Sequence, residues 1–234
     1  MAYIIGGRCD FSINGVSART VGLVVDELRP PPMAKQRYSV WKVGTDTDLT
    51  APDDEFDSPE YHIRARIIGK PAHDNTLIYA FLAAAKTLEL STQAGYYFKV
   101  QQVLGSSPTT ALRGNEQTYD IGFVLAPFKY LLSNDEITVE SDTVKNPGNR
   151  YSKPIWRLTG CNGDAALTVN GQTLQIKSYG TAYIDTERMI AYNGSNENIM
   201  PKTIGIFPFL QPGQNAVAYS GATGLSVKIN GRCW

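Results

Sequence analysis

The two histidines are the side chains of this sequence best suited to act as general bases near neutral pH. His62 lies in the alternating segment YHIRARII and His73 precedes an expected helix, so both fall in the first half of the 234-residue chain. The second half contains no histidine. No motif places a serine or cysteine nucleophile beside either imidazole. The sequence therefore predicts that the chain is not an enzyme and has no catalytic residue.

The densest group of carboxylates lies in GTDTDLTAPDDEFD, residues 44–57. A calcium-binding EF-hand loop starting at Asp46 would need glycine at its sixth position and glutamate at its twelfth, where this chain has Ala51 and Asp57. The stretch instead predicts a solvated loop that its own charges keep extended, and it also suits an arm that reaches a neighbouring subunit.

Other cofactor signatures are missing from the sequence. Neither Gly6-Gly7 nor Gly95 stands between a strand and a helix with phosphate-loop spacing. The three cysteines, Cys9, Cys161 and Cys233, lack zinc-ligand spacing and are too few for a disulfide framework. We therefore predict no metal, no cofactor and reduced thiols.

The charge balance and the hydropathy of the sequence argue against nucleic acid and membranes as partners. Lys plus Arg number 22 and Asp plus Glu number 22, and the expected halves, 1–132 and 133–234, carry −1 and +1. Neither half has the excess of positive charge that phosphate binding requires, so specific nucleic-acid recognition is not expected. No apolar run approaches the roughly 20 residues of a membrane helix, and no signal peptide is evident. The expectation is a chain folded in a cytoplasm, without a membrane partner.

Most periodic segments alternate with period two, which is typical of strands with one buried face. In YHIRARII, residues 61–68, the buried face is predicted to hold Tyr61, Ile63, Ala65 and Ile67. Further strands are expected at 21–25, 96–104, 118–126 and 136–140. Asn170-Gly171 predicts a two-residue hairpin turn, because both of its central residues need positive φ. These patterns predict a mainly β protein.

One helix is expected at 74–90, where Leu77, Ile78, Phe81, Leu82, Ala85 and Leu88 form an apolar stripe. The fold class follows as an N-terminal β-sandwich-like domain, 1–132, with this flanking helix, plus a C-terminal jelly-roll β-sandwich, 133–234. Aromatic side chains, Trp41, Trp156 and Trp234 among them, are expected mainly in cores or oligomer contacts. Phe207, Phe209 and Leu210 are expected to anchor a structural turn at Pro212-Gly213.

Taken in order, several segments resemble the distal tail (Dit) proteins of long-tailed phages with non-contractile tails. CDFSINGVSARTVGLVV, residues 9–25, resembles the family's opening strand, Asn-Gly turn and next strand. The later segments that resemble it are NPGNRYSKPIWRLTG (146–160), YGTAYIDTERMIAY (179–192), FPFLQPGQNAV (207–217), LSVKING and the terminal Trp234. Together they span nearly the full length.

The resemblance implies a galectin-like C-terminal sandwich and a structural role at the tip of a virion tail. Such proteins form a hexameric ring between the tail tube and the tail-associated fibre or lysin protein, and their outer domains hold receptor-binding proteins. It also implies an arm at residues 44–58 that embraces the adjacent subunit, with Gly44, Thr45, Asp46, Thr47, Asp48 and Leu49 at the oligomer interface. Many relatives carry an Ile-Pro-Gly-Arg-Asp-Gly type segment where this chain has VWKVGTDTDLT, so the geometry of the arm is open.

A carbohydrate-binding β-sandwich module is the alternative function. A galectin site uses a histidine, an asparagine, an arginine and a stacking tryptophan on neighbouring strands. Trp156-Arg157 supplies only part of this set, and a shared fold does not transfer binding chemistry.

Overall fold

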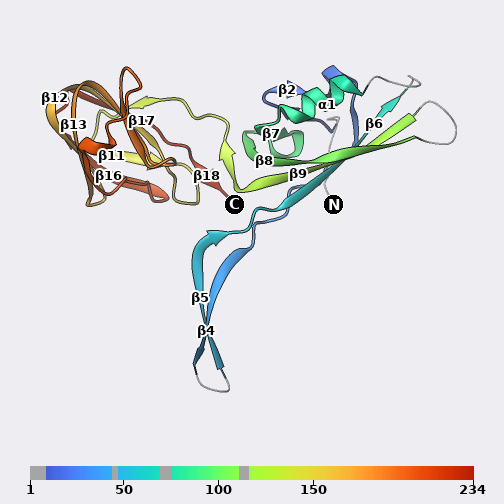
Figure 1. Ribbon diagram of the computed structural model, residues 1–234, viewed down its shortest axis with the longest axis horizontal. Coiled ribbons are helices and arrows are strands. Elements are labelled where there is room, and N and C mark those ends of the chain that lie inside the picture. The colour runs from blue at the N-terminus through green and yellow to red at the C-terminus, as the bar shows by residue number, and fades with distance from the viewer. Residues whose placement is uncertain (1–8, 44–46, 69–74, 111–115) are drawn as a thin grey trace. The chain divides into compact units, whose positions relative to one another are not determined.

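The computed structural model describes residues 9–43, 47–68, 75–110 and 116–234, without the side chains of residues 41–43, 47–54, 68, 107, 110 and 116. The chain divides into two compact units between Lys129 and Tyr130, a few residues before the boundary expected after residue 132. Each unit has one major antiparallel sheet (Figure 1). Each also has its own hydrophobic core.

The sheet of the first unit places strands from distant parts of the chain side by side. Its order is β2 (Val16–Ser17), β1 (Phe11–Ile13), β7 (Thr87–Leu90), β8 (Tyr96–Thr110), β9 (Glu116–Leu131), β6 (Glu60–Ile68) and β3 (Val24–Glu27). The alternation predicted for β6 is confirmed, because Tyr61, Ile63, Ala65 and Ile67 are all buried. Short 3-10 helices follow β2, at Ala18–Val21, and β7, at Ser91–Gln93.

The flanking helix is shorter than predicted. Helix α1 covers Thr76–Ala83, whereas 87–90 form strand β7, so the prediction of a helix over 74–90 was wrong at its C-terminal end. Ile78 and Leu82 pack into the core of the sheet, but Leu88 reaches that core from β7. The physical reason is Asn14, whose side-chain oxygen accepts hydrogen bonds from the backbone N–H groups of Lys86 and Thr87 at 3.0 and 3.1 Å.

The second unit is a β-sandwich built around one folded hairpin, β12 (Ile155–Val169) and β13 (Gln172–Asp185). The N-terminal part of β12 pairs with β17 and its C-terminal part with β16. Between these two parts, the pairing of β12 with β13 shifts register from Leu158 to Cys161. One layer therefore runs β10 (Ile137–Thr138), β17 (Gly224–Lys228), β12, β13 and β14 (Ile190–Asn193). The other runs β11 (Thr143–Asn146), β16 (Gly213–Ser220), β12, β13 and β15 (Thr203–Gly205).

The two layers enclose a single core. Trp156 and Leu158 point into it from one layer, and Leu167 and Val169 from the other, all fully buried. The remaining short elements of this unit are the 3-10 helix Met200–Lys202 and β18 (Arg232–Cys233). With α1 as the one α-helix in the described part of the chain, the predicted mainly β fold class is confirmed.

One of the two turns predicted from sequence is confirmed. Asn170 and Gly171 have φ of 49° and 83°, and they join Val169 to Gln172 in the hairpin of β12 and β13. At Pro212-Gly213, Gly213 has the positive φ expected of a turn, 84°, but the predicted reversal was wrong. Leu210 pairs with Ser152 before this bend and Gly213 with Asn146 after it, so the chain continues antiparallel to the same segment as it enters β16. Phe207 and Leu210 are buried beside this turn, and Phe209 is half-buried.

Candidate functional site: the β4–β5 arm

The predicted arm is a β-hairpin. Strand β4 (Gln36–Val43) pairs with β5 (Thr47–Phe56) in an antiparallel ladder that runs from Gln36 opposite Phe56 to Val43 opposite Thr47 (Figure 1). The prediction of an extended loop over 44–58 was therefore wrong, because 47–56 are strand residues paired to 36–43. The alternation of polar and apolar residues in QRYSVWKV could have predicted β4. The aspartates of β5 are rare in strands, so its sequence predicts a loop.

The predicted interface residues fall at the end of this hairpin. Gly44, Thr45 and Asp46 lie outside the described residues. Thr47, Asp48 and Leu49 belong to β5 and pair with Val43, Lys42 and Trp41, respectively. These residues lie next to residues 44–46, at the opposite end of the hairpin from Gln36 and Phe56.

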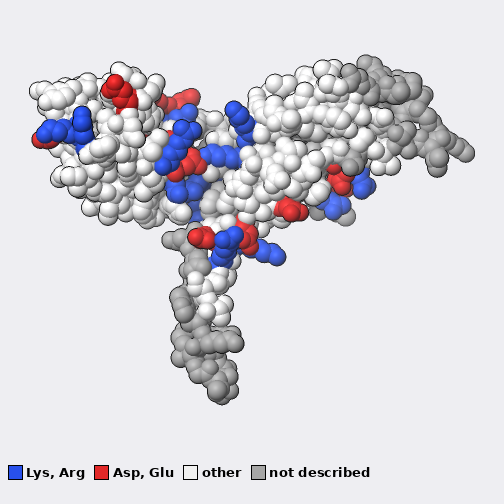
Figure 2. All heavy atoms as spheres, in the orientation of Figure 1, with Lys and Arg blue, Asp and Glu red and all other residues white. Residues whose placement is uncertain are grey.

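Charged side chains join the two strands at the base of the arm. Arg37 of β4 donates from Nε to Asp57 at 2.6 Å and from Nη1 to Glu55 at 3.1 Å. The hydrogen bond to Asp57 is the main reason that the pKa of Arg37 is raised. In Figure 2, Lys or Arg atoms and Asp or Glu atoms lie against one another where the arm begins. All three side chains are exposed, so they orient the base more than they stabilise it.

Buried and aromatic contacts hold the base of the arm to the first unit. The ring of Phe56 meets that of Phe128 edge to face, with centroids 5.1 Å apart. The backbone N–H of Asp57 donates to the carbonyl of Lys35 at 2.9 Å. The segments before and after the arm are also joined: the buried Tyr61 hydroxyl donates to the Arg29 carbonyl at 2.6 Å, and burial raises the pKa of this tyrosine.

Beyond its base, the described part of the arm is a two-stranded ribbon with exposed apolar side chains. Within the described ranges, β4 and β5 pair only with each other. Tyr38 and Val40, two residues apart on one face of β4, are 57% and 55% exposed. A two-stranded ribbon with exposed apolar side chains gains stability when another surface covers it.

One of the two histidines, His62, lies within the described residues, on the surface of the first unit. The Nδ1 atom of His62 lies 3.3 Å from the carboxylate of Asp120 on the neighbouring strand β9, and both side chains are more than half exposed. His73 lies outside the described residues. Among the residues that are described, no cluster of His, Cys, Asp and Glu could hold a metal ion, and no helix is long and apolar enough to cross a membrane.

The Trp156-Arg157 pair does not form a sugar-stacking site. Trp156 is fully buried, and its indole N–H donates to the Pro208 carbonyl at 3.4 Å. Arg157 faces outward, where its guanidinium lies 5.8 Å from the ring centre of Tyr183 and pairs with Glu136 at 3.3 Å. Tyr183 in turn stacks on Tyr192, with ring centres 5.1 Å apart. Both faces of the Tyr183 ring are therefore occupied.

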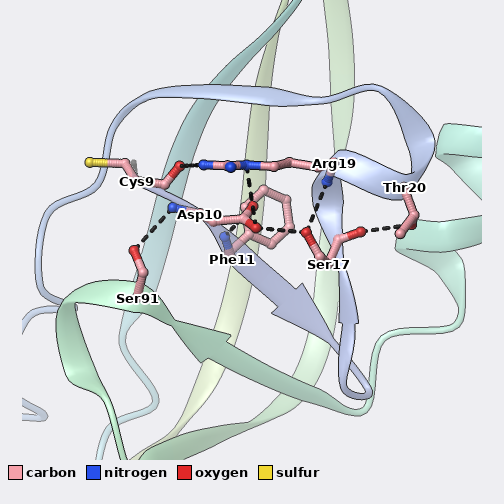
Figure 3. Close-up of polar contacts among 7 residues, drawn as sticks. All are labelled: Cys9, Asp10, Phe11, Ser17, Arg19, Thr20 and Ser91. Carbon is pink, nitrogen blue, oxygen red and sulfur yellow. Dashed lines mark hydrogen bonds and ion pairs between the residues drawn. The ribbon is translucent and has the colours of Figure 1, made fainter. Parts of the chain in front are cut away.

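A polar cluster that the sequence analysis missed holds the start of β1 (Figure 3). The carboxylate of Asp10 accepts hydrogen bonds from the Ser17 hydroxyl at 2.6 Å and from the Phe11 N–H at 2.9 Å, and it lies 3.6 Å from Nε of Arg19. Arg19 also donates to the Cys9 carbonyl at 3.3 Å. These contacts tie the residues just before β1 to those just after β2, so they fix the two ends of the β1–β2 hairpin against each other.

Together, the two units and the β4–β5 hairpin define a two-domain, mainly β protein. The fold is that of a phage Dit protein. The chain superposes on the crystal structure of the SPP1 Dit (gp 19.1) protein with a TM-score of 0.70 and 14% sequence identity, over 94% of this chain and 97% of that one. SPP1 Dit is described as a paradigm of the hub adsorption apparatus in phages that infect Gram-positive bacteria. No family model and no curated protein matches the sequence.

Proposed function

We propose that this chain is a structural protein of a phage tail tip, a distal tail protein whose copies form a hexameric ring. The ring joins the tail tube to the tail fibre and receptor-binding apparatus. The observation that carries the proposal is the structural match to SPP1 Dit, which covers both units and nearly all of each chain. A match confined to one sandwich would support far less, because β-sandwiches serve many unrelated functions.

The arm supplies the physical basis for ring formation. A rotationally symmetric ring needs two different surfaces on each copy, one that donates a contact and one that receives it. The β4–β5 hairpin, with Tyr38 and Val40 exposed and no third strand in the described ranges, has the properties of the donating surface. In this role it contacts the adjacent copy.

The proposed partners follow from this position in a tail. The ring contacts the tail tube protein on one side and the tail-associated fibre or lysin protein on the other, and its second unit is available to a receptor-binding protein. Assembly takes place in the cytoplasm of the host bacterium, and the finished ring resides at the virion tail tip. In this role the chain works through its shape and its interfaces.

Native mass spectrometry of the purified full chain tests this proposal. We expect a complex of about six times the 25.7 kDa subunit. A matched variant replaces residues 38–54 with an Asn-Gly turn, which keeps the Arg37 and Glu55 side chains at the base. This variant should fold but yield smaller species. A full-length chain that stays monomeric at every concentration, alone and with tail tube protein, would contradict the proposal.

A further inference from the structure

The outer face of one layer of the second unit carries side chains of different chemistry in a regular array. Along β12 and β13, alternate residues point into the core, and the residues between them point outward. The pairing of β16, β12, β13 and β15 places outward residues side by side on four neighbouring strands. These residues are Asp164, Ala166, Gln175, Lys177, Ile204 and Ser220. One surface thus offers a carboxylate, an amide, an ammonium group and a hydroxyl.

The same residues line an open groove of about 560 Å³. Lys202, from the 3-10 helix before β15, also lines it, and Ile204 is 73% exposed. Asp164 and Lys177 lie 3.6 Å apart, but their side chains are 87% and 61% exposed. This contact is too long for a strong hydrogen bond, so both groups keep hydrogen-bonding capacity for a ligand that replaces water.

An exposed tyrosine extends the array beyond the groove. Tyr179 follows Lys177 by two residues on β13, so it points outward on the same face, about 7 Å further along the strand. It is 73% exposed. Its hydroxyl lies 3.8 Å from the position that a Cβ atom on Gly163 would take, so the side chain reaches across to β12. The ring therefore lies beside the Asp164–Lys177 pair and remains open to a ligand.

Saccharides are the ligands whose chemistry matches this surface. A pyranose has an apolar face of C–H groups, which can stack on an exposed aromatic ring, and hydroxyl groups that both donate and accept hydrogen bonds. Asp164 supplies acceptors, Lys177 supplies donors, and Gln175 supplies both. A polyanion such as nucleic acid suits the surface less, since the Asp164 carboxylate stands beside Lys177.

We propose that this face binds an uncharged oligosaccharide, with one sugar ring stacked on Tyr179 and the next hydrogen-bonded to the Asp164–Lys177 pair. The site is separate from the Trp156-Arg157 pair, which lies on the part of β12 that joins β17. The inference adds a binding activity to the proposed structural function. It does not depend on ring formation, because all of its residues belong to the second unit.

Binding of the purified full chain to a glycan array tests the inference. The array carries tetrasaccharides of α-glucose, β-glucose, β-galactose and N-acetylglucosamine, with dextran sulfate as a polyanion. Isothermal titration calorimetry then gives the Kd of each ligand that binds. We expect binding to at least one of the tetrasaccharides. Binding to none of them, or to dextran sulfate alone, would overturn the inference.

Three variants show whether the saccharide binds at this face. Tyr179→Ala and Asp164→Asn should each raise the Kd at least about tenfold, whereas Tyr179→Phe, which keeps the ring, should stay within about threefold. The matched control is Tyr219→Ala, which should bind normally. Tyr219 is also exposed, but it pairs with the core-facing Leu167 and so belongs to the other side of the sheet. Equal affinity of Tyr179→Ala and the intact chain, with thermal unfolding unaltered, would place the binding elsewhere and overturn the inference.

Native mass spectrometry of the same samples separates this inference from the proposed function. A chain that assembles but binds no tetrasaccharide would refute the saccharide site and leave the ring proposal standing. A chain that binds a tetrasaccharide through Tyr179 but stays monomeric, alone and with tail tube protein, would do the reverse.

Discussion

Replacing Asn215 by alanine should destabilise the second unit. Asn215 is fully buried beside the turn at Pro212-Gly213. Its amide nitrogen donates to the carbonyls of Val144, Gln211 and Gly213 at 3.3, 2.9 and 2.9 Å. Its oxygen accepts from the Gln211 N–H and from Asn170, each at 2.7 Å. One side chain thus ties β11, the turn and the hairpin of β12 and β13 together.

The expected magnitude follows from which partners can reach water after the substitution. Gln211 and Asn170 are exposed, so their groups can rehydrate at little cost. Val144 is buried, and its carbonyl then loses a side-chain partner in the interior. One hydrogen bond contributes about 1 kcal/mol and an unsatisfied buried group costs about 1–3 kcal/mol, so the free energy of unfolding should fall by about 2–4 kcal/mol.

Hydrogen exchange measured by mass spectrometry on the full chain gives this value for the second unit alone. The slowest amides of β12 and β13 report its unfolding, and they should exchange faster in Asn215→Ala by a factor that corresponds to that free energy. The matched control is Asn162→Ala, an exposed asparagine on β12, for which we expect a change within about 0.5 kcal/mol. A loss below about 0.5 kcal/mol for Asn215→Ala would refute the reasoning.

Three further changes test other parts of the structure. Trp156→Ala removes the largest fully buried side chain. By the same exchange measurement, the free energy of unfolding of the second unit should fall by about 3–5 kcal/mol, and a small effect would place this tryptophan outside the core. Asn14→Ala removes the side-chain acceptor of the Lys86 and Thr87 N–H groups. In urea titrations, the free energy of unfolding of the first unit should fall by about 1–3 kcal/mol, and an unchanged value would contradict this role of Asn14. Burial, aided by the Glu187 carboxylate, raises the pKa of Tyr130 to about 12 from its usual value near 10. Because the unfolded chain then ionises first, the second unit should lose stability as pH rises from 10 towards 12, and Tyr130→Phe should weaken this dependence in alkaline melts; an equal slope in both proteins would contradict it.

Local patterns predicted much of the fold. Alternation along β6 located a buried face correctly, because a strand in a one-sided sheet must place every second residue inward. The Asn170-Gly171 hairpin is likewise a local property, since its turn requires positive φ at two successive residues. Such features depend on a few neighbouring residues and not on the rest of the chain.

The end of the helix depended on a distant residue. In residues 76–90 the apolar side chains suit both a continuous helix and a helix followed by a strand. The choice is made by Asn14, more than 70 residues earlier, which binds the amides at 86 and 87, and by β1, which pairs with β7. Tertiary contacts of this kind override local propensity. They are invisible in any short window of the sequence.

The arm predicted at 44–58 overlaps the β4–β5 hairpin, but its predicted conformation was wrong. Its aspartates predicted a solvated loop, although the backbone there is a strand paired to β4. The ladder of backbone hydrogen bonds outweighs the low strand propensity of these residues.

Electron microscopy of the purified full-length protein tests the central claim most directly, because one class average reports both closure and symmetry. We expect annular particles with six-fold rotational symmetry, and the variant lacking residues 38–54 should not form them. Uniform particles of single-subunit size, or open filaments, in preparations of the intact chain with tail tube protein would contradict the account.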